Sequence, residues 1–171
     1  ENFNENISNW DVSNVTSMVY MFHNVNEFNQ PLDDWNVSNV TNMIGMFTEA
    51  YAFNQPLNNW NVSQVTNMTG MFFDASFNQP LNNWNVSKVK NMKYMFSYTN
   101  EFNQPLNNWN VSNVTNMIEM FSFTIKFNKP LNNWDVSNVI DMTAMFYEAL
   151  QFSQPLNDWN VYKVINMKNM F

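Results

Sequence analysis

The sequence predicts a repeat solenoid, in which similar coils stack along one axis and each coil contacts its neighbours. The first observation is the tryptophan spacing: all seven recur every 25 residues, except for one interval of 24 between Trp60 and Trp84. The second is a repeated unit that, with few departures, reads F-N-Q-P-L-x-x-W-[ND]-V-S-x-V-x-x-M-x-x-M-F from Phe28 onward. Self-similarity at a fixed period of this length indicates stacked repeats. We therefore expect residues 1–171 to form a single domain of seven tandem coils, cut from a longer protein.

The apolar spacing changes inside each repeat, and this change predicts two faces. Trp35 and Val37 are two residues apart, which is the same-side period of a strand, so W-[ND]-V is predicted as a short parallel β-strand. After the serine the spacing becomes three, as in Val114, Met117 and Met120. That spacing is typical of a helix, so V-x-x-M-x-x-M-F is predicted as a short α or 3₁₀ turn on the opposite face.

These residues carry a family resemblance. Leu32-x-x-Trp35-x-Val37 resembles the L-x-x-L-x-L strand of a leucine-rich repeat, and residues 40–47 resemble the V-T-x-I-x-x-x-A-F segment of BspA-like leucine-rich repeats. The whole unit is similar to the repeat of mycoplasma-type surface lipoproteins, a family of undefined function. The resemblance implies a leucine-rich-repeat-like fold and a bacterial cell-surface location, in contact with other proteins. It covers essentially all 171 residues.

The tryptophans are predicted to form a buried core ladder, because each is in phase with leucine and valine. A column of sugar-stacking platforms is the alternative, and it is less consistent with that phase. The fourteen methionines fall in M-x-x-M pairs, from Met18 and Met21 onward. Thioethers could hold Cu(I), but methionine is also an adaptable core filler, so no metal site is predicted. The predicted core ladder consists of Trp10, Trp35, Trp60, Trp84, Trp109, Trp134 and Trp159.

The residue after each tryptophan always carries an amide or a carboxylate. In a strand it would point away from the core, so that stacked amides could bond to one another along the coils. Calcium ligation is the rival interpretation, but the two aspartates in this set are separated by four amide-bearing coils. We therefore predict a polar ladder of Asp11, Asn36, Asn61, Asn85, Asn110, Asp135 and Asn160.

Composition and motifs argue against several function classes. The net charge is −7 and all seven basic residues are lysine, which disfavours nucleic-acid binding. No apolar run reaches the roughly 20 residues of a membrane helix, so direct membrane insertion is not expected. His23 is the only histidine, it lies in a variable link, and no Gly-rich phosphate loop is present. We therefore expect neither an enzyme nor a cofactor.

The remaining classes are binding and assembly. The leading expectation is a non-enzymatic surface module for protein binding or adhesion. The alternatives are a structural module that stacks head to tail into filaments and, less favoured, a calcium- or glycan-binding module. The partner is expected to be a protein on a host or on the same cell, or further copies of the chain. The candidate partner-binding edge comprises Tyr20, His23, Tyr51, Phe73, Tyr94, Tyr98, Phe123, Tyr147 and Leu150, all in or beside the turns and links.

Overall fold

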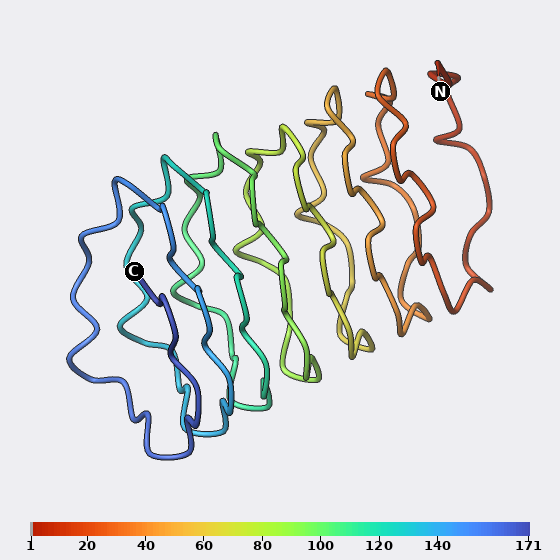
Figure 1. The fold of residues 1–171 in the computed structure, drawn as a ribbon. Coiled ribbons are helices and arrows are strands. Elements are labelled where there is room, and N and C mark those ends of the chain that lie inside the picture. The colour runs from red at the N-terminus through yellow and green to blue at the C-terminus, as the bar shows by residue number, and fades with distance from the viewer. Residues whose placement is uncertain (1) are drawn as a thin grey trace.

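The computed structural model describes residues 2–171, and the chain winds through them as a stack of similar coils (Figure 1). The N-terminal residues lie at one end of the stack and the C-terminal residues in the last coil at the other end. Each circuit of the chain uses one sequence repeat, so residues of equal rank in successive repeats lie in columns along the stack. This columnar arrangement fixes the position of every candidate site.

Within a coil, the backbone is a succession of tight turns. In the second coil Trp35 N–H donates to the Leu32 carbonyl and Val40 N–H to the Val37 carbonyl, at 3.0 and 2.9 Å. The same three-residue step continues at Met46, Thr48, Ala50 and Phe53, which donate to the residues three before them. Bonds of this kind close β-turns, and each coil repeats them at equivalent positions.

Between coils, backbone pairing is limited to isolated parallel bridges. One bridge residue per repeat pairs with its equivalents in the adjacent coils, and no bridge extends into a strand within residues 2–171. Along the turns, amides that donate within the coil alternate with amides that donate to the next coil. Gly45 and Phe47, for example, donate to the carbonyls of Thr69 and Met71 in the next coil. The bridges join Ser17, Asn42, Asn67, Asn91, Asn116, Asp141 and Asn166 in that order.

The predicted leucine-rich-repeat-like fold is wrong, because W-[ND]-V forms no strand. The peptide groups around this segment already take part in other hydrogen bonds. The Leu32 carbonyl accepts hydrogen bonds from Trp35 N and from Trp60 Nε1 of the next coil, and the Val37 carbonyl accepts from Val40 N. A β-ladder needs these groups free to pair with a neighbour. The bridges form instead at the residue before the first methionine, one turn further along.

The predicted α or 3₁₀ turns at V-x-x-M-x-x-M-F are also absent, and residues 2–171 contain no helix. In a helix, consecutive amides donate back along the same chain. Here only alternate amides do so: Met46 N donates to Met43 O, whereas Gly45 N crosses to the next coil. The apolar spacing of three therefore reflects the period of successive β-turns.

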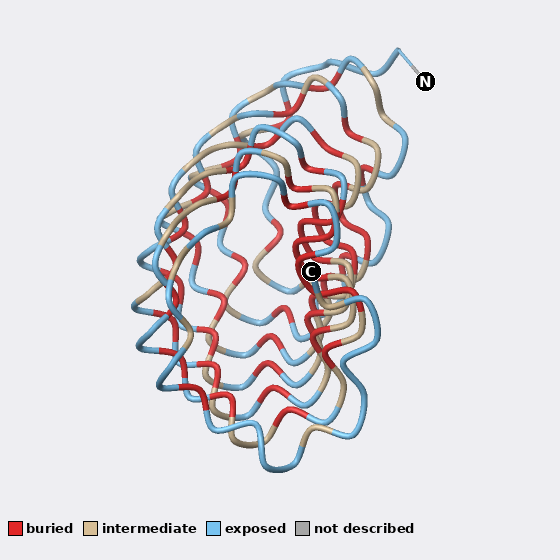
Figure 2. Cartoon of the chain, turned by 60° about the vertical axis from the view of Figure 1, so that its left-hand side comes forward, coloured by how far each residue is buried: buried red, intermediate tan, exposed pale blue. Residues whose placement is uncertain are grey.

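Buried residues recur at equivalent places in successive coils (Figure 2). Their side chains form aromatic and aliphatic columns inside the coils. One column stacks Phe22, Phe47, Phe72, Phe96, Phe121, Phe146 and Phe171, with ring centroids 5.4–5.8 Å apart and planes within 7°. Trp35 and the five later tryptophans are 2–8% exposed, but Trp10 is 53% exposed. The methionines of the five inner M-x-x-M pairs, from Met43 to Met145, are all buried. Offset aromatic stacks add to the area that is buried between coils.

Candidate binding groove on the aromatic edge

The seven residues predicted as a polar ladder bond within their own coils. The side-chain oxygen of each accepts the amide hydrogen of the residue two positions later, as in Asn110 with Ser112 at 3.1 Å and Asp135 with Ser137 at 3.0 Å. This is the geometry of an Asx turn. Hydrogen bonds from the serine two positions later, first from its hydroxyl and then from its amide, lower the pKa of the Asp11 and Asp135 carboxyls.

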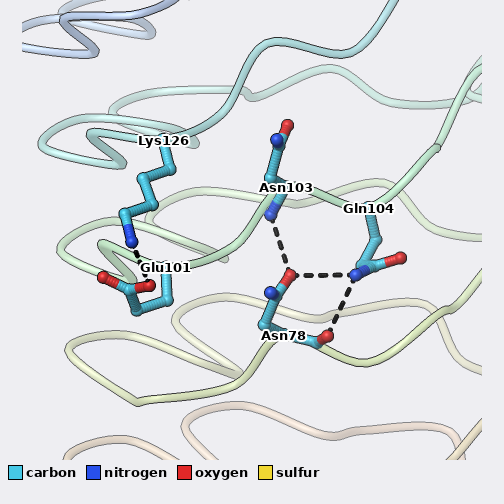
Figure 3. Close-up of polar contacts among 5 residues, drawn as sticks. All are labelled: Asn78, Glu101, Asn103, Gln104 and Lys126. Carbon is cyan, nitrogen blue, oxygen red and sulfur yellow. Dashed lines mark hydrogen bonds and ion pairs between the residues drawn. The ribbon is translucent and has the colours of Figure 1, made fainter.

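Asparagines do bond from coil to coil, but at a different position of the repeat. The second residue of F-N-Q-P-L forms this asparagine column. Asn78 Oδ1 accepts from Asn103 N and from Gln104 Nε2, both at 3.0 Å (Figure 3). The column runs through Asn4, Asn29, Asn54, Asn78, Asn103, Asn128 and Ser153. It ties together the coils that carry the aromatic edge.

A second column contains both glycines of the chain. Gly45 and Gly70 occupy one repeat position in adjacent coils, and their neighbours in the column are Tyr20 and Tyr94. All members of this column have a positive φ of 50–61°. Besides the two glycines, the members are Tyr20, Tyr94, Glu119, Ala144 and Asn169. Because five coils place a side chain on this backbone conformation, glycine is not needed for the turn itself. What glycine changes here is the space above the turn.

The two glycines leave different spaces. A Cβ atom at Gly45 would lie 2.2 Å from Cε1 of Tyr20, so the tyrosine ring already covers Gly45. At Gly70 the nearest atom to an added Cβ would be Phe73 Cβ at 3.7 Å, which is ordinary contact distance. The floor at Gly70 is therefore open, and Tyr20 lies at one end of it.

Aromatic rings surround this open floor. Phe73 meets the rings of Tyr94 and Tyr98 edge to face, with centroid distances of 6.2 and 5.7 Å. The resulting groove has a volume of about 680 Å³, within the range of ligand-binding pockets. It is lined by Tyr20, His23, Gly45, Thr48, Thr69, Gly70, Phe73, Tyr94, Tyr98 and Glu119.

The charged groups near the groove are mainly acidic. Glu119 lines it, and Glu49 lies beside it with Oε2 4.0 Å from Nε2 of His23. One lysine is close, since Lys93 Nζ lies 4.6 Å from the centroid of the Tyr94 ring. With a net charge of −7 on the chain, the groove favours a neutral or cationic occupant over an anionic one.

The structure brings five of the nine predicted edge residues into this groove: Tyr20, His23, Phe73, Tyr94 and Tyr98. Phe123 continues the aromatic line, stacked on Tyr98 at 4.5 Å, and Tyr147 meets it edge to face at 5.5 Å. Tyr51 lies apart from the groove and donates to Asp74 Oδ2 at 3.0 Å, and desolvation followed by this bond raises the pKa of Tyr51. Leu150 is 70% exposed and lies with Tyr147 beside a smaller hollow near Phe171.

Sequence reasoning missed the floor and the polar lining of the groove: Gly45, Gly70, Thr48, Thr69 and Glu119. A usable signal was present, because two glycines at one repeat position replace larger residues in adjacent coils. The predicted edge residues were chosen as large side chains at positions that vary between repeats. Glycine has no side chain, so the two glycines were not selected. Within residues 2–171, no three His, Asp or Glu side chains come together as metal ligands would.

Stacked coils with a repeated core define a tandem-repeat protein. The profile of the family described as "Mycoplasma protein of unknown function, DUF285" matches residues 1–81 and again residues 66–171. The chain belongs to this family. The match agrees with the resemblance to mycoplasma-type repeats, and it does not extend to BspA-like leucine-rich repeats. No curated protein matches the chain.

Proposed function

We propose that the chain is a non-enzymatic surface repeat module that binds another protein through the aromatic groove. The observation that carries this proposal is the pair Gly45 and Gly70: Gly45 leaves room for the Tyr20 ring, and Gly70 leaves an open floor beside it where other coils carry side chains. Aromatic side chains grouped in a hollow are typical of residues that dominate binding energy at protein interfaces. The resemblance to mycoplasma-type surface repeats adds an extracellular, cell-surface setting and a role in adhesion. Within residues 2–171, no helix is long and apolar enough to cross a membrane.

A display library of peptides, selected on the parent chain, tests this function. Binding of each enriched peptide is then measured on Gly70→Tyr, which fills the floor with a side chain that Tyr20 and Tyr94 show to be compatible with this φ. Ala144→Tyr is the matched control, because it makes a similar addition at the same repeat position outside the groove.

The proposal expects Gly70→Tyr to weaken binding by about tenfold or more, as loss of a hot-spot contact does. Ala144→Tyr should bind like the parent. Equal losses in both variants, or a selection that enriches no peptide, would contradict a protein-binding groove.

A second candidate function is head-to-tail stacking into filaments or longer stacks. The observation that favours it is the pairing between coils, in which successive coils present equivalent donors and acceptors to the next one. A surface that repeats in this way can accept another copy head to tail. Sedimentation over a wide concentration range tests it: a growing series of species supports stacking, and a single monomer species at high concentration removes it.

A further inference from the structure

We propose that the groove takes an arginine side chain from an extended peptide segment of the partner protein, an assignment that rests on the proposed function. The guanidinium would lie beside the rings of Phe73 and Tyr98, with its charge directed to Glu119 of the following coil. Three features of the groove support this choice of occupant: its rings, its charge and the state of its hydroxyl groups.

The rings of this edge already bind a cation. Lys93 Nζ lies 4.6 Å from the centroid of Tyr94, inside the distance at which a cation is attracted by an aromatic face. That lysine is supplied by the chain itself and uses the Tyr94 ring. The other rings of the groove face a space of about 680 Å³, which is large enough for a side chain from a partner.

The charge of the groove lining also favours a cationic side chain. Glu119 is the acidic residue in the lining, and no lysine contributes to it. A flat guanidinium is less strongly hydrated than an ammonium group, stacks on rings and can pair with a carboxylate at the same time. Arginine therefore fits this combination of rings and carboxylate better than lysine does.

The hydroxyl groups argue against a neutral sugar as the occupant. Sugar recognition needs free polar partners, and the two threonines of the lining already donate within the chain. Thr48 Oγ1 donates to the Gly70 carbonyl at 2.7 Å, and Thr69 Oγ1 donates to Asn67 Oδ1 at 2.7 Å. A ligand rich in hydroxyls would therefore find no free threonine donor on this floor.

The test uses the two glycines as reporters. They are the only glycines in the chain, so their amide signals in a ¹H–¹⁵N NMR spectrum report on the groove floor without ambiguity. The parent chain is titrated with a capped Gly-Ser-Gly-Arg-Gly-Ser-Gly peptide, with its twin in which neutral citrulline replaces arginine, and with a neutral trisaccharide. We expect the arginine peptide to shift both glycine signals and to bind about tenfold more tightly than the citrulline peptide.

Variants locate the contact. Glu119→Gln and Tyr98→Ala should each weaken arginine binding several-fold, whereas the exposed controls Glu148→Gln and Tyr162→Ala should leave it unchanged. Lys93→Gln should strengthen binding, because it removes the chain's own cation from the edge. A merely structural role of these residues would not produce that gain.

Equal binding of the arginine and citrulline peptides, glycine shifts with the trisaccharide alone, or no shift with any ligand would each overturn the arginine assignment. The protein-binding proposal fails separately. If library-selected peptides shift the glycine signals and their binding does not depend on arginine, the protein-binding proposal stands and only the arginine assignment is overturned.

Discussion

The indole nitrogen of Trp84 donates a hydrogen bond to the main-chain carbonyl of Leu57, 2.8 Å away in the preceding coil. The same bond recurs from Trp35 to Trp159, always to the residue three before the tryptophan of the previous coil. A buried indole N–H needs such a partner. The tryptophan therefore both fills the core and replaces a backbone bond where no strand forms.

Replacing this tryptophan should destabilise the stack strongly. Trp84→Ala is expected to cost about 3–5 kcal/mol of unfolding free energy, because a buried aromatic leaves a cavity. Trp10→Ala should cost clearly less, since Trp10 is 53% exposed. Denaturant unfolding measures both, and equal losses would show that the inner tryptophans are not core residues.

The asparagine column supports a second stability prediction. Asn78→Ala removes the acceptor used by Asn103 N and Gln104 Nε2, and it should cost about 1–3 kcal/mol, as for other unsatisfied partly buried donors. Asn78→Asp keeps an acceptor oxygen and should remain close to the parent. The exposed Asn82→Ala is the control, with an expected effect within about 0.5 kcal/mol. A loss with Asp as large as with Ala would argue against the hydrogen bond as the cause.

Removal of divalent ions should leave stability unchanged. The carboxylates of Asp11 and Asp135 already accept the amide hydrogens of Ser13 and Ser137, at 3.0 Å in both cases. We expect the same melting temperature with and without a chelator, for the parent and for the double variant Asp11→Asn, Asp135→Asn. A chelator-sensitive parent whose sensitivity disappears in the double variant would establish ion sites.

Asp135 should also contribute to stability in a pH-dependent way. Its pKa is lowered in the folded chain from an ordinary value of 3.8, so its contribution is complete above that value and is lost as the pH falls through the folded pKa. Because Asp135 is exposed, the effect should be small. Asp135→Asn keeps the turn, as Asn110 does with Ser112, and should lose less stability in acid than the parent. Melting temperatures at neutral and acidic pH check this, and an unchanged acid sensitivity would contradict the assignment.

The repeat, the coil boundaries and much of the edge could be predicted from the sequence, because a periodic pattern places equivalent residues in columns. The local structure could not. Trp35 and Val37 have strand spacing, and Val114, Met117 and Met120 have helical spacing, yet successive β-turns satisfy both patterns. Side-chain spacing records which residues point inward and does not record where the amides donate.

In the candidate site, too, side-chain patterns predicted some residues and missed others. Tyr20, Phe73 and Tyr94 were accessible to prediction as large residues at variable positions of the repeat. The groove itself depends on Gly45 and Gly70, where the informative feature is a missing side chain. The predicted polar ladder was misplaced for a related reason. The repeated amide after each tryptophan predicted bonds from coil to coil, but the turns decide which asparagine faces the next coil.

The most direct test of the account is an NMR measurement of scalar couplings across hydrogen bonds at Gly45, which lies in the groove floor. In the stack described here, Gly45 N–H donates to the Thr69 carbonyl of the next coil at 2.9 Å. We expect a coupling between the Gly45 nitrogen and the Thr69 carbonyl carbon. A coupling to the Thr41 carbonyl carbon, four residues earlier, would mean that the turn is helical and would contradict the coil pairing that opens the groove.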